Sequence, residues 1–310
     1  MTSIKPIQPN LFIPGAAKSG TSSLHELLNQ HPDICMSSVK EPHFWTRPDF
    51  ESYTNKDIEN YLSLFNLKES AKFKGESSTG YMAFPRFINH IKKHYNNQPK
   101  FIFILRNPID RCYSHYWWLK GMGSERKEFI KSVLFDIGIE PIHSSRLPEA
   151  NYKNYFQFGL YGKWLGKFYA NFENANIKII TFESLKKNPL ETINTCFDFL
   201  DIRRLNKINE ISANKTLILK KPYLYKYAKL IAFNQIKLPQ IIKNHIPNNI
   251  KILIRKHLIK SVLKYTKSNK TYPEISVNNR EFIADLYKKD VAFLKKLTGL
   301  KFEEWTDFNN

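Results

Sequence analysis

The segment "NLFIPGAAKSGTSSLHELLNQHP", residues 10–32, combines a short apolar run, a turn with two glycines around a lysine, and an amphipathic helix. The apolar residues 11–14 predict a buried strand, and three leucines lie on one face of a helix over 21–30. A strand that ends in a glycine loop at a helix N-terminus offers backbone N–H groups and a positive dipole to an anion. The segment therefore predicts an anion-binding site in an α/β fold.

Strand and helix signals alternate along most of the remaining sequence. Further strands are predicted at 33–38, 72–77, 100–106 and 177–182, and further helices at 109–120, 161–172, 189–200 and 280–299. The strand "KFIFILR" (100–106) is apolar without alternation, as central parallel strands are. This order predicts an α/β fold with a P-loop-like parallel sheet that has helices on both faces.

The charge of the chain is concentrated near its C-terminal end. The net charge is +20, and residues 211–273 contain fourteen Lys or Arg and no Asp or Glu. Because this segment is also rich in Ile, Leu and Tyr, we expect basic amphipathic helices inserted into one domain that spans residues 1–310. The insertion then has one of two roles. In the first it binds an acidic surface, which is either a polyanionic glycan or the inner membrane leaflet. In the second its helices pack on the sheet and leave their lysines in water.

Cysteine usage and the N-terminal residues bear on the compartment. Cys35, Cys112 and Cys196 are far apart in apolar contexts, which favours core packing over a metal site or a disulfide framework. The opening residues "MTSIKPIQPN" are polar, and no window has the apolar length of a membrane span. We expect a soluble cytoplasmic protein, with contact at the inner membrane only as a peripheral surface.

The glycine loop differs from a Walker A loop, because its lysine precedes the second glycine in "GAAKSGTS" (15–22). Backbone N–H groups and hydroxyls can still surround an anion, and Lys18 and the helix dipole add positive charge. The residues expected to hold the anion are Lys18, Ser19, Gly20, Thr21, Ser22 and Ser23. The alternative is a turn of small residues without a ligand.

Two other segments reach the same predicted edge of the sheet. Arg106 ends the strand over 100–106 and Ser114 lies eight residues further on, where open α/β sheets bind ligands. An arginine and a hydroxyl there suit a second phosphate. Arg111 lies close enough in sequence to contribute, with a surface ion pair as its alternative role. "KEPHFW" (40–45) follows the second strand and brings Glu41 and His43 to this edge.

These motifs together resemble those of the sulfotransferases. "IPGAAKSGTSSLHELLNQHPDICMSSVKEPHFW" looks like the 5′-phosphosulfate loop with its following strand, and "FIFILRNPIDRCYSHYWW" looks like the 3′-phosphate motif. "TFESLKKNP" and the C-terminal "KTYPEISVNNREFIADLYKKDVAFLKKLTGLKFEEW" also match, most closely the heparan-sulfate and bacterial branch. The resemblance covers nearly the whole chain except parts of 124–151 and the basic segment.

The resemblance implies transfer of a sulfuryl group from 3′-phosphoadenosine 5′-phosphosulfate to an acceptor hydroxyl or amine, without a metal ion. Lys18 would stabilise the leaving oxygen as in phosphoryl transfer, while the loop would hold the 5′-phosphate. Arg106 and Ser114 would hold the 3′-phosphate. Glu41 occupies the position of the general base of glycan sulfotransferases, and His43 would orient the acceptor. His43 is the competing base, and a pairing of Glu41 with Lys40 or Lys18 that only orders the loop is the alternative.

The sequence departs from these relatives in two places. Where many glycan enzymes have Glu-Lys-Ser-Pro, this chain has Glu-Ser-Ser-Thr at 76–79, so an acceptor-side lysine is missing. The basic loop before "YP" becomes "KSNKTYP", in which either Lys267 or Lys270, together with Tyr272, could contact the donor. We expect a carbohydrate, glycolipid or small-molecule alcohol as acceptor, and no nucleic acid partner. A catalytically inactive nucleotide- or polyanion-binding relative and a P-loop kinase are the alternative functions.

Overall fold

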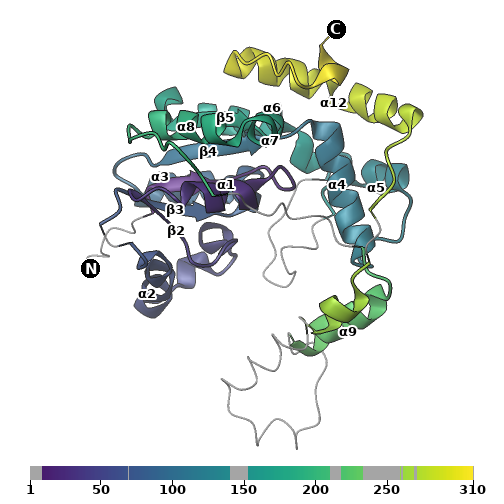
Figure 1. Ribbon diagram of the computed structural model, residues 1–310, viewed down its shortest axis with the longest axis horizontal. Helices are drawn as coiled ribbons and strands as arrows, with labels where there is room; N and C mark the ends of the chain where they lie inside the picture. The colour runs from purple at the N-terminus through teal and green to yellow at the C-terminus, as the bar shows by residue number, and fades with distance from the viewer. Residues whose placement is uncertain are drawn as a thin grey trace, which may run out of the picture.

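The computed structural model describes residues 9–68, 70–139, 153–209, 218–232, 259, 261–268 and 271–309. A five-stranded, all-parallel sheet with the order β2-β3-β1-β4-β5 forms the centre of this part of the chain (Figure 1). Its strands are β1 (Leu11–Ile13), β2 (Ile34–Met36), β3 (Phe73–Ser77), β4 (Lys100–Leu105) and β5 (Ile177–Thr181). The predicted α/β fold with a parallel sheet flanked by helices is therefore confirmed.

The α-helices described are α1 (Thr21–Leu28), α2 (Asn55–Leu62), α3 (Pro85–His94), α4 (Pro108–Gly121), α5 (Phe129–Asp136), α6 (Tyr161–Tyr169), α7 (Phe182–Lys187), α8 (Pro189–Phe199), α9 (Pro222–Ala232) and α12 (Val277–Thr298). All the strands and helices named above from sequence patterns are present. The patterns did not predict α2, α3, α5 and α7, which have six to ten residues each. Among the described residues, no helix combines the length and the apolar character that crossing a membrane requires.

Alternate side chains of the central strands enter two separate cores, one on each face of the sheet. On β4, Phe101 and Phe103 pack with α3, α6 and α12, whereas Ile102 and Ile104 pack with α1 and α8. Because both faces are covered, β4 needs no polar side, which explains its uninterrupted apolar sequence. All three cysteines are buried and none forms a disulfide, so the prediction of core packing is confirmed.

The described part of the basic segment lies beyond the C-terminal end of α4, away from the sheet (Figure 1). We call residues 218–232 and 261–268 the arm. Leu219 forms an isolated antiparallel bridge with Lys267 within it, and the Leu219 N–H donates to the Gly121 carbonyl at 3.1 Å. The alternative in which these helices pack on the sheet is therefore wrong for α9. The rest of the predicted insertion lies outside the described residues.

Candidate active site

The loop between β1 and α1 is anchored on the neighbouring strand β4. The Ala16 N–H donates to the Ile104 carbonyl at 2.8 Å, and the Ile104 N–H donates to the Gly15 carbonyl at 3.0 Å. Gly20, which precedes α1, has φ of +93°, and a Cβ there would lie 2.8 Å from the ring of Phe182. Only glycine fits both the conformation and the close approach. A side chain at position 20 would therefore prevent the loop from adopting this conformation.

The first turn of α1 has unused hydrogen-bonding capacity. As in any helix, the N–H groups of the first turn, residues 21–23, lack intrahelical acceptors. Among the described residues, no capping side chain accepts from them, and the first turn contains no acidic residue. Ser19 is fully buried, and its Oγ has no hydrogen-bond partner of good geometry within the described chain. The nearby Tyr161 hydroxyl donates to the Arg106 carbonyl at 2.9 Å instead. These groups fit an anion, as the sequence predicted for residues 19–23.

Lys18 lies among other cations at this point. Its Nζ is 4.8 Å from the centre of the Trp118 ring, a contact that the sequence did not indicate. Burial of its ammonium group and the charges of Arg106 and Arg111 lower the pKa of Lys18 from 10.5 to about 8, and Lys40 acts in the same direction. Converging cations repel one another unless an anion lies between them. The electrostatics therefore favour a polyanionic ligand.

Arg106 follows β4, and Ser114 lies on the helix α4 that comes next in the chain. The guanidinium of Arg106 lies 5.0 Å from the centre of the Phe182 ring, the same ring that approaches Gly20. Ser114 is buried on α4, one of whose first residues, Asp110, forms a 2.7 Å ion pair with Arg280 of α12. This C-terminal helix thus fixes the start of α4, a function that no local pattern could reveal.

Within the described chain, Arg111 does not form the surface ion pair that the sequence left open as its alternative role. It is fully buried, its Nη2 donates to the Tyr155 carbonyl, and its Nη1 lies 3.4 Å from His115 Nδ1. The alternative of a surface ion pair is therefore wrong, because α12 and the segment from Tyr155 to Gly159 pack on α4. Sequence spacing alone cannot show which face of α4 is covered.

Glu41 and His43 meet at the carboxyl end of β3. Glu41 Oε2 lies 3.0 Å from His43 Nε2 and Glu41 Oε1 lies 2.6 Å from Lys40 Nζ. The Thr79 N–H donates to the same carboxylate at 2.9 Å, a contact not predicted from the sequence. The side chain of Glu41 is 23% exposed, whereas that of His43 is 2% exposed. Of the two candidate bases, Glu41 is thus the one that a substrate can reach directly.

The charge state of Glu41 follows from these contacts. Burial alone would raise the pKa of its carboxyl group, but the charge of Lys40 and the His43 contact outweigh burial and lower the pKa to about 2. Glu41 is therefore ionised at neutral pH and ready to accept a proton, although its basicity is weak while Lys40 remains paired with it. An anion that draws Lys40 away would raise this pKa.

The C-terminal residues predicted to contact the donor lie in different places. Tyr272 stacks on Trp117 of α4 with a centroid distance of 5.9 Å and meets Tyr113 edge-on at 5.8 Å. Tyr113 and Trp117 lie on either side of Ser114 in the sequence. Tyr272 therefore packs on the helix that carries Ser114. Lys267 is exposed in the arm, and Lys270 lies outside the described residues.

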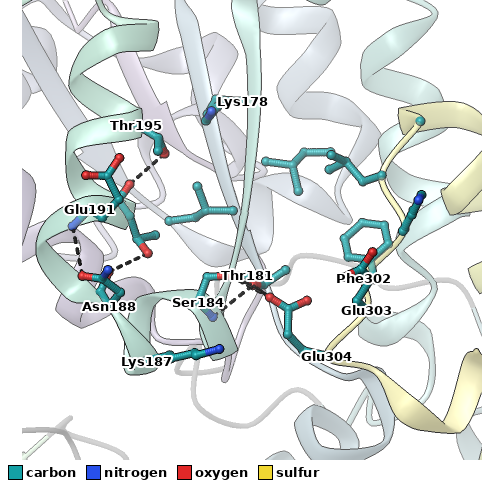
Figure 2. Close-up of a pocket in the computed structure, with 16 residues that line it drawn as sticks. Lys178, Thr181, Ser184, Lys187, Asn188, Glu191, Thr195, Phe302, Glu303 and Glu304 are labelled. Carbon is teal, nitrogen blue, oxygen red and sulfur yellow. Dashed lines mark hydrogen bonds between the residues drawn. The ribbon is translucent and has the colours of Figure 1, made fainter.

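A cavity of about 1020 Å³ lies elsewhere, along the outer edge of β5 (Figure 2). It is lined by β5, α7, α8 and residues 299–304 and contains none of the predicted site residues. Several of its polar groups bind one another: Ser184 Oγ donates to Glu304 Oε1 at 2.8 Å, and the Glu191 N–H donates to Asn188 Oδ1 at 3.4 Å (Figure 2). The candidate active site is instead the edge where β1, β3 and β4 end.

Comparison with known proteins identifies the family of this chain. Residues 8–292 match the family model described as "Sulfotransferase domain". The chain is 25% identical over 260 residues to human Carbohydrate sulfotransferase 15, covering 67% of this chain and 46% of that protein. It is 24% identical over 200 residues to human Heparan sulfate glucosamine 3-O-sulfotransferase 6, covering 64% of this chain and 53% of that protein. The chain thus spans about half the length of the curated relatives it matches.

A solved structure shows the same fold. The sulfotransferase from Alicyclobacillus acidocaldarius superimposes with a TM-score of 0.66 at 24% identity, covering 96% of this chain and 99% of that one. At this identity the likeness concerns the fold, including the parallel sheet and the helices that cover it.

Proposed function

This chain belongs to the sulfotransferase domain family, and we propose that it transfers a sulfuryl group from 3′-phosphoadenosine 5′-phosphosulfate to an acceptor hydroxyl or amine. The observation that carries the proposal is the half-buried Lys18 just before the uncapped N-terminus of α1, where the charges of Arg106 and Arg111 act on its ammonium group. The donor supplies an activated sulfuryl group and two phosphate positions. Cations and free N–H groups at one sheet edge suit such a polyanion.

The residues of the edge take separate roles in this proposal. Residues 19–23 bind the 5′-phosphate through N–H and hydroxyl groups, and Lys18 stabilises negative charge on the leaving oxygen. Arg106 and Ser114 bind the 3′-phosphate, and Tyr272 packs on Trp117 and Tyr113 of α4. Lys267 or Lys270 remains a candidate for a further phosphate contact. No metal ion is part of the proposal.

On the acceptor side, we propose that Glu41 accepts the proton of the attacking hydroxyl and that His43 orients the acceptor. The exposed fraction of Glu41 supports its direct contact with the substrate. The buried position of His43 supports a role through Glu41, to which it lies 3.0 Å away. The alternative in which Glu41 only orders the loop draws on the 2.6 Å contact with Lys40.

Arg106→Ala should remove most of the preference for adenosine 3′,5′-bisphosphate over adenosine 5′-phosphate. Loss of a charge-assisted contact to phosphate costs about 1.5–3 kcal/mol, which is roughly 10- to 100-fold in affinity. Calorimetry with both nucleotides measures the ratio. Arg204→Ala, which breaks exposed ion pairs with Asp198 and Glu191 instead, is the control. An unchanged ratio in Arg106→Ala would place the 3′-phosphate elsewhere.

The acceptor is proposed to be a carbohydrate or glycolipid, with a small-molecule alcohol as the alternative. The names of the relatives support a carbohydrate. Many glycan enzymes have a lysine where this chain has Ser77. The missing positive charge argues against a highly sulfated glycan as the acceptor. Mass spectrometry of glycans, glycolipids and small alcohols incubated with enzyme and donor tests this choice. Thermal shift with adenosine 3′,5′-bisphosphate against ATP–Mg²⁺ separates a sulfotransferase or an inactive binder from a kinase, and turnover separates the first two.

We also propose that the chain is one cytoplasmic domain whose basic insertion, at about 211–273, contacts an acidic membrane leaflet peripherally. In the arm, Tyr225 and Ala228 are buried, whereas Tyr223 and Tyr227 are more than half exposed one helical turn apart. Tyr265 is exposed as well, with Lys221 Nζ 5.6 Å from its ring centre. Exposed tyrosines among lysines suit the boundary between lipid headgroups and water.

Lys221→Gln with Lys264→Gln should reduce flotation with liposomes that contain acidic lipid. Each lysine near an anionic bilayer contributes about 1 kcal/mol, so two together give roughly 30-fold in partitioning at low salt. Lys186→Gln with Lys187→Gln, an equal charge change on exposed positions of α7, is the matched control. If the wild type does not float at low salt, or both double variants lose flotation equally, the arm does not bind membranes.

A further inference from the structure

A buried carboxylate lies behind the loop that carries Glu41 and His43. Glu76, on β3, is 0% exposed, and the charge of His43 acts on its carboxylate. Buried carboxylates are costly unless several groups donate hydrogen bonds to them. The contacts of Glu76 therefore need a structural or functional reason.

The carboxylate of Glu76 is held by hydroxyl groups. Ser78 Oγ donates to its Oε1 at 2.6 Å, and the Tyr61 hydroxyl donates to its Oε2. Burial raises the pKa of Glu76, and the hydroxyls that donate to it act in the opposite direction. Each oxygen of the carboxylate thus accepts a hydrogen bond from a different element, one from α2 and one from the residues after β3.

The same hydroxyls continue to the loop of residues 41–45. The His43 N–H donates to Ser78 Oγ at 3.0 Å, and the Trp45 indole N–H donates to the Tyr61 hydroxyl at 3.0 Å. Ser78 and Tyr61 each donate to Glu76 and accept from the loop. Because each hydroxyl donates its hydrogen to Glu76, its oxygen lone pairs turn toward the N–H group of the loop. Glu76 therefore orients both hydroxyls.

The loop needs such support because of its backbone conformation. Glu41 has φ of +59° and His43 has φ of +50°, two left-handed residues that are not glycine within three positions. This conformation is unfavourable for residues other than glycine and persists only where the surroundings determine it. A hydrogen bond to the His43 N–H acts directly on one of the two strained residues.

We infer that Glu76 is a positioning residue that holds the Glu41–His43 pair in place through Ser78 and through Tyr61. The inference rests on the proposed function, in which this pair serves the acceptor. Glu76 itself touches neither substrate nor the reacting atoms. It acts on the backbone that directs His43 Nε2 toward Glu41 Oε2 at 3.0 Å.

Glu76→Gln and Ser78→Ala test the inference. A glutamine places an amide N–H₂ against one of the two donating hydroxyls, and the alanine removes the link to His43. We expect kcat to fall by about 10- to 100-fold, as small displacements of catalytic groups do, with the affinity for adenosine 3′,5′-bisphosphate within about twofold of wild type. Ser78→Thr keeps the hydroxyl and should restore kcat. Hydrogen exchange of the amides of residues 41–46 should become faster in both damaged variants.

Ser132→Ala is the matched control, because Ser132 is also a buried serine but donates to the Glu128 carbonyl on α5. Unchanged kcat and exchange in folded Glu76→Gln and Ser78→Ala would overturn the inference. An equal loss of kcat and of nucleotide affinity would also overturn it, because that result indicates general unfolding. If Glu41→Gln retains full turnover, the proposed base is wrong, and the exchange rate at His43 still decides whether Glu76 positions the loop.

Discussion

Lys18→Ala should lower kcat by about two or more orders of magnitude and weaken the binding of adenosine 3′,5′-bisphosphate. Removing a preorganised group that stabilises charge in the transition state typically costs this much. The loss should exceed that of an ordinary surface lysine, because Lys18 is half-buried beside Trp118 and the α1 N-terminus, where its charge is poorly screened. Steady-state kinetics and calorimetry on the same preparations measure both effects.

The pH dependence of nucleotide binding provides a second test of Lys18. In the free protein the pKa of Lys18 is lowered to about 8, so the amine loses its proton above that pH, whereas a bound polyanion favours the protonated form. Affinity in the wild type should therefore fall as pH rises through about 8, with proton uptake on binding, and Lys18→Ala should lack this contribution.

Lys163→Ala is the matched control for both measurements. Lys163 is half-buried, and its Nζ lies 4.4 Å from the centre of the Trp164 ring, much as Lys18 lies over Trp118. It belongs to α6 and has no proposed contact with the donor. If Lys18→Ala performs like Lys163→Ala, the charge of Lys18 has no part in the reaction.

The anion loop could be predicted from sequence because its groups are contiguous. Residues 10–32 define a strand, a turn and a helix whose termini are set by local hydrogen bonding, and the same holds for Arg106 after β4. The parallel sheet followed from the order of the elements. Such inferences need no knowledge of which distant residues touch.

The remainder of the site depends on contacts between distant segments. The Thr79 N–H that binds Glu41, the Tyr61 hydroxyl that binds Glu76 and the carbonyl that binds Arg111 come from elements far apart in the chain. Their residue types are common, so spacing does not reveal them. The difference in exposure between Glu41 and His43 is likewise a property of packing that no local pattern gives.

Glu41→Gln should lower kcat by about two or more orders of magnitude while leaving nucleotide affinity within about twofold of wild type, since general bases contribute roughly 10²–10⁴-fold. The amide retains the size of the side chain and can still accept from the Thr79 N–H, so the loop should keep its shape. Hydrogen exchange of residues 41–46 should therefore be unchanged, in contrast to Glu76→Gln. This difference separates loss of a base from loss of its support.

A second Lys-Glu-His group supplies the control for this prediction. Glu51 lies 3.1 Å from Lys93 and 3.6 Å from His90, an exposed counterpart of Glu41 with Lys40 and His43. Glu51→Gln removes the same charge in the same kind of setting, and we expect no effect on kcat. A loss of turnover in both variants would indicate an effect of net charge.

His43→Ala decides between the two candidate bases. If Glu41 is the base, this variant should lose only about tenfold in kcat through poorer orientation. In the wild type, kcat/KM should then show no acid limb from Glu41 between about pH 5 and about pH 7, because Lys40 and His43 lower the pKa of that carboxyl to about 2. If Glu41→Gln instead turns over near the wild-type rate and His43→Ala is inactive, the base is His43. An acid limb in the ordinary range of an imidazole would accompany that result. In that case the carboxylate of Glu41 would act only by orienting the ring, since their 3.0 Å contact leaves His43 with a fixed partner on that nitrogen.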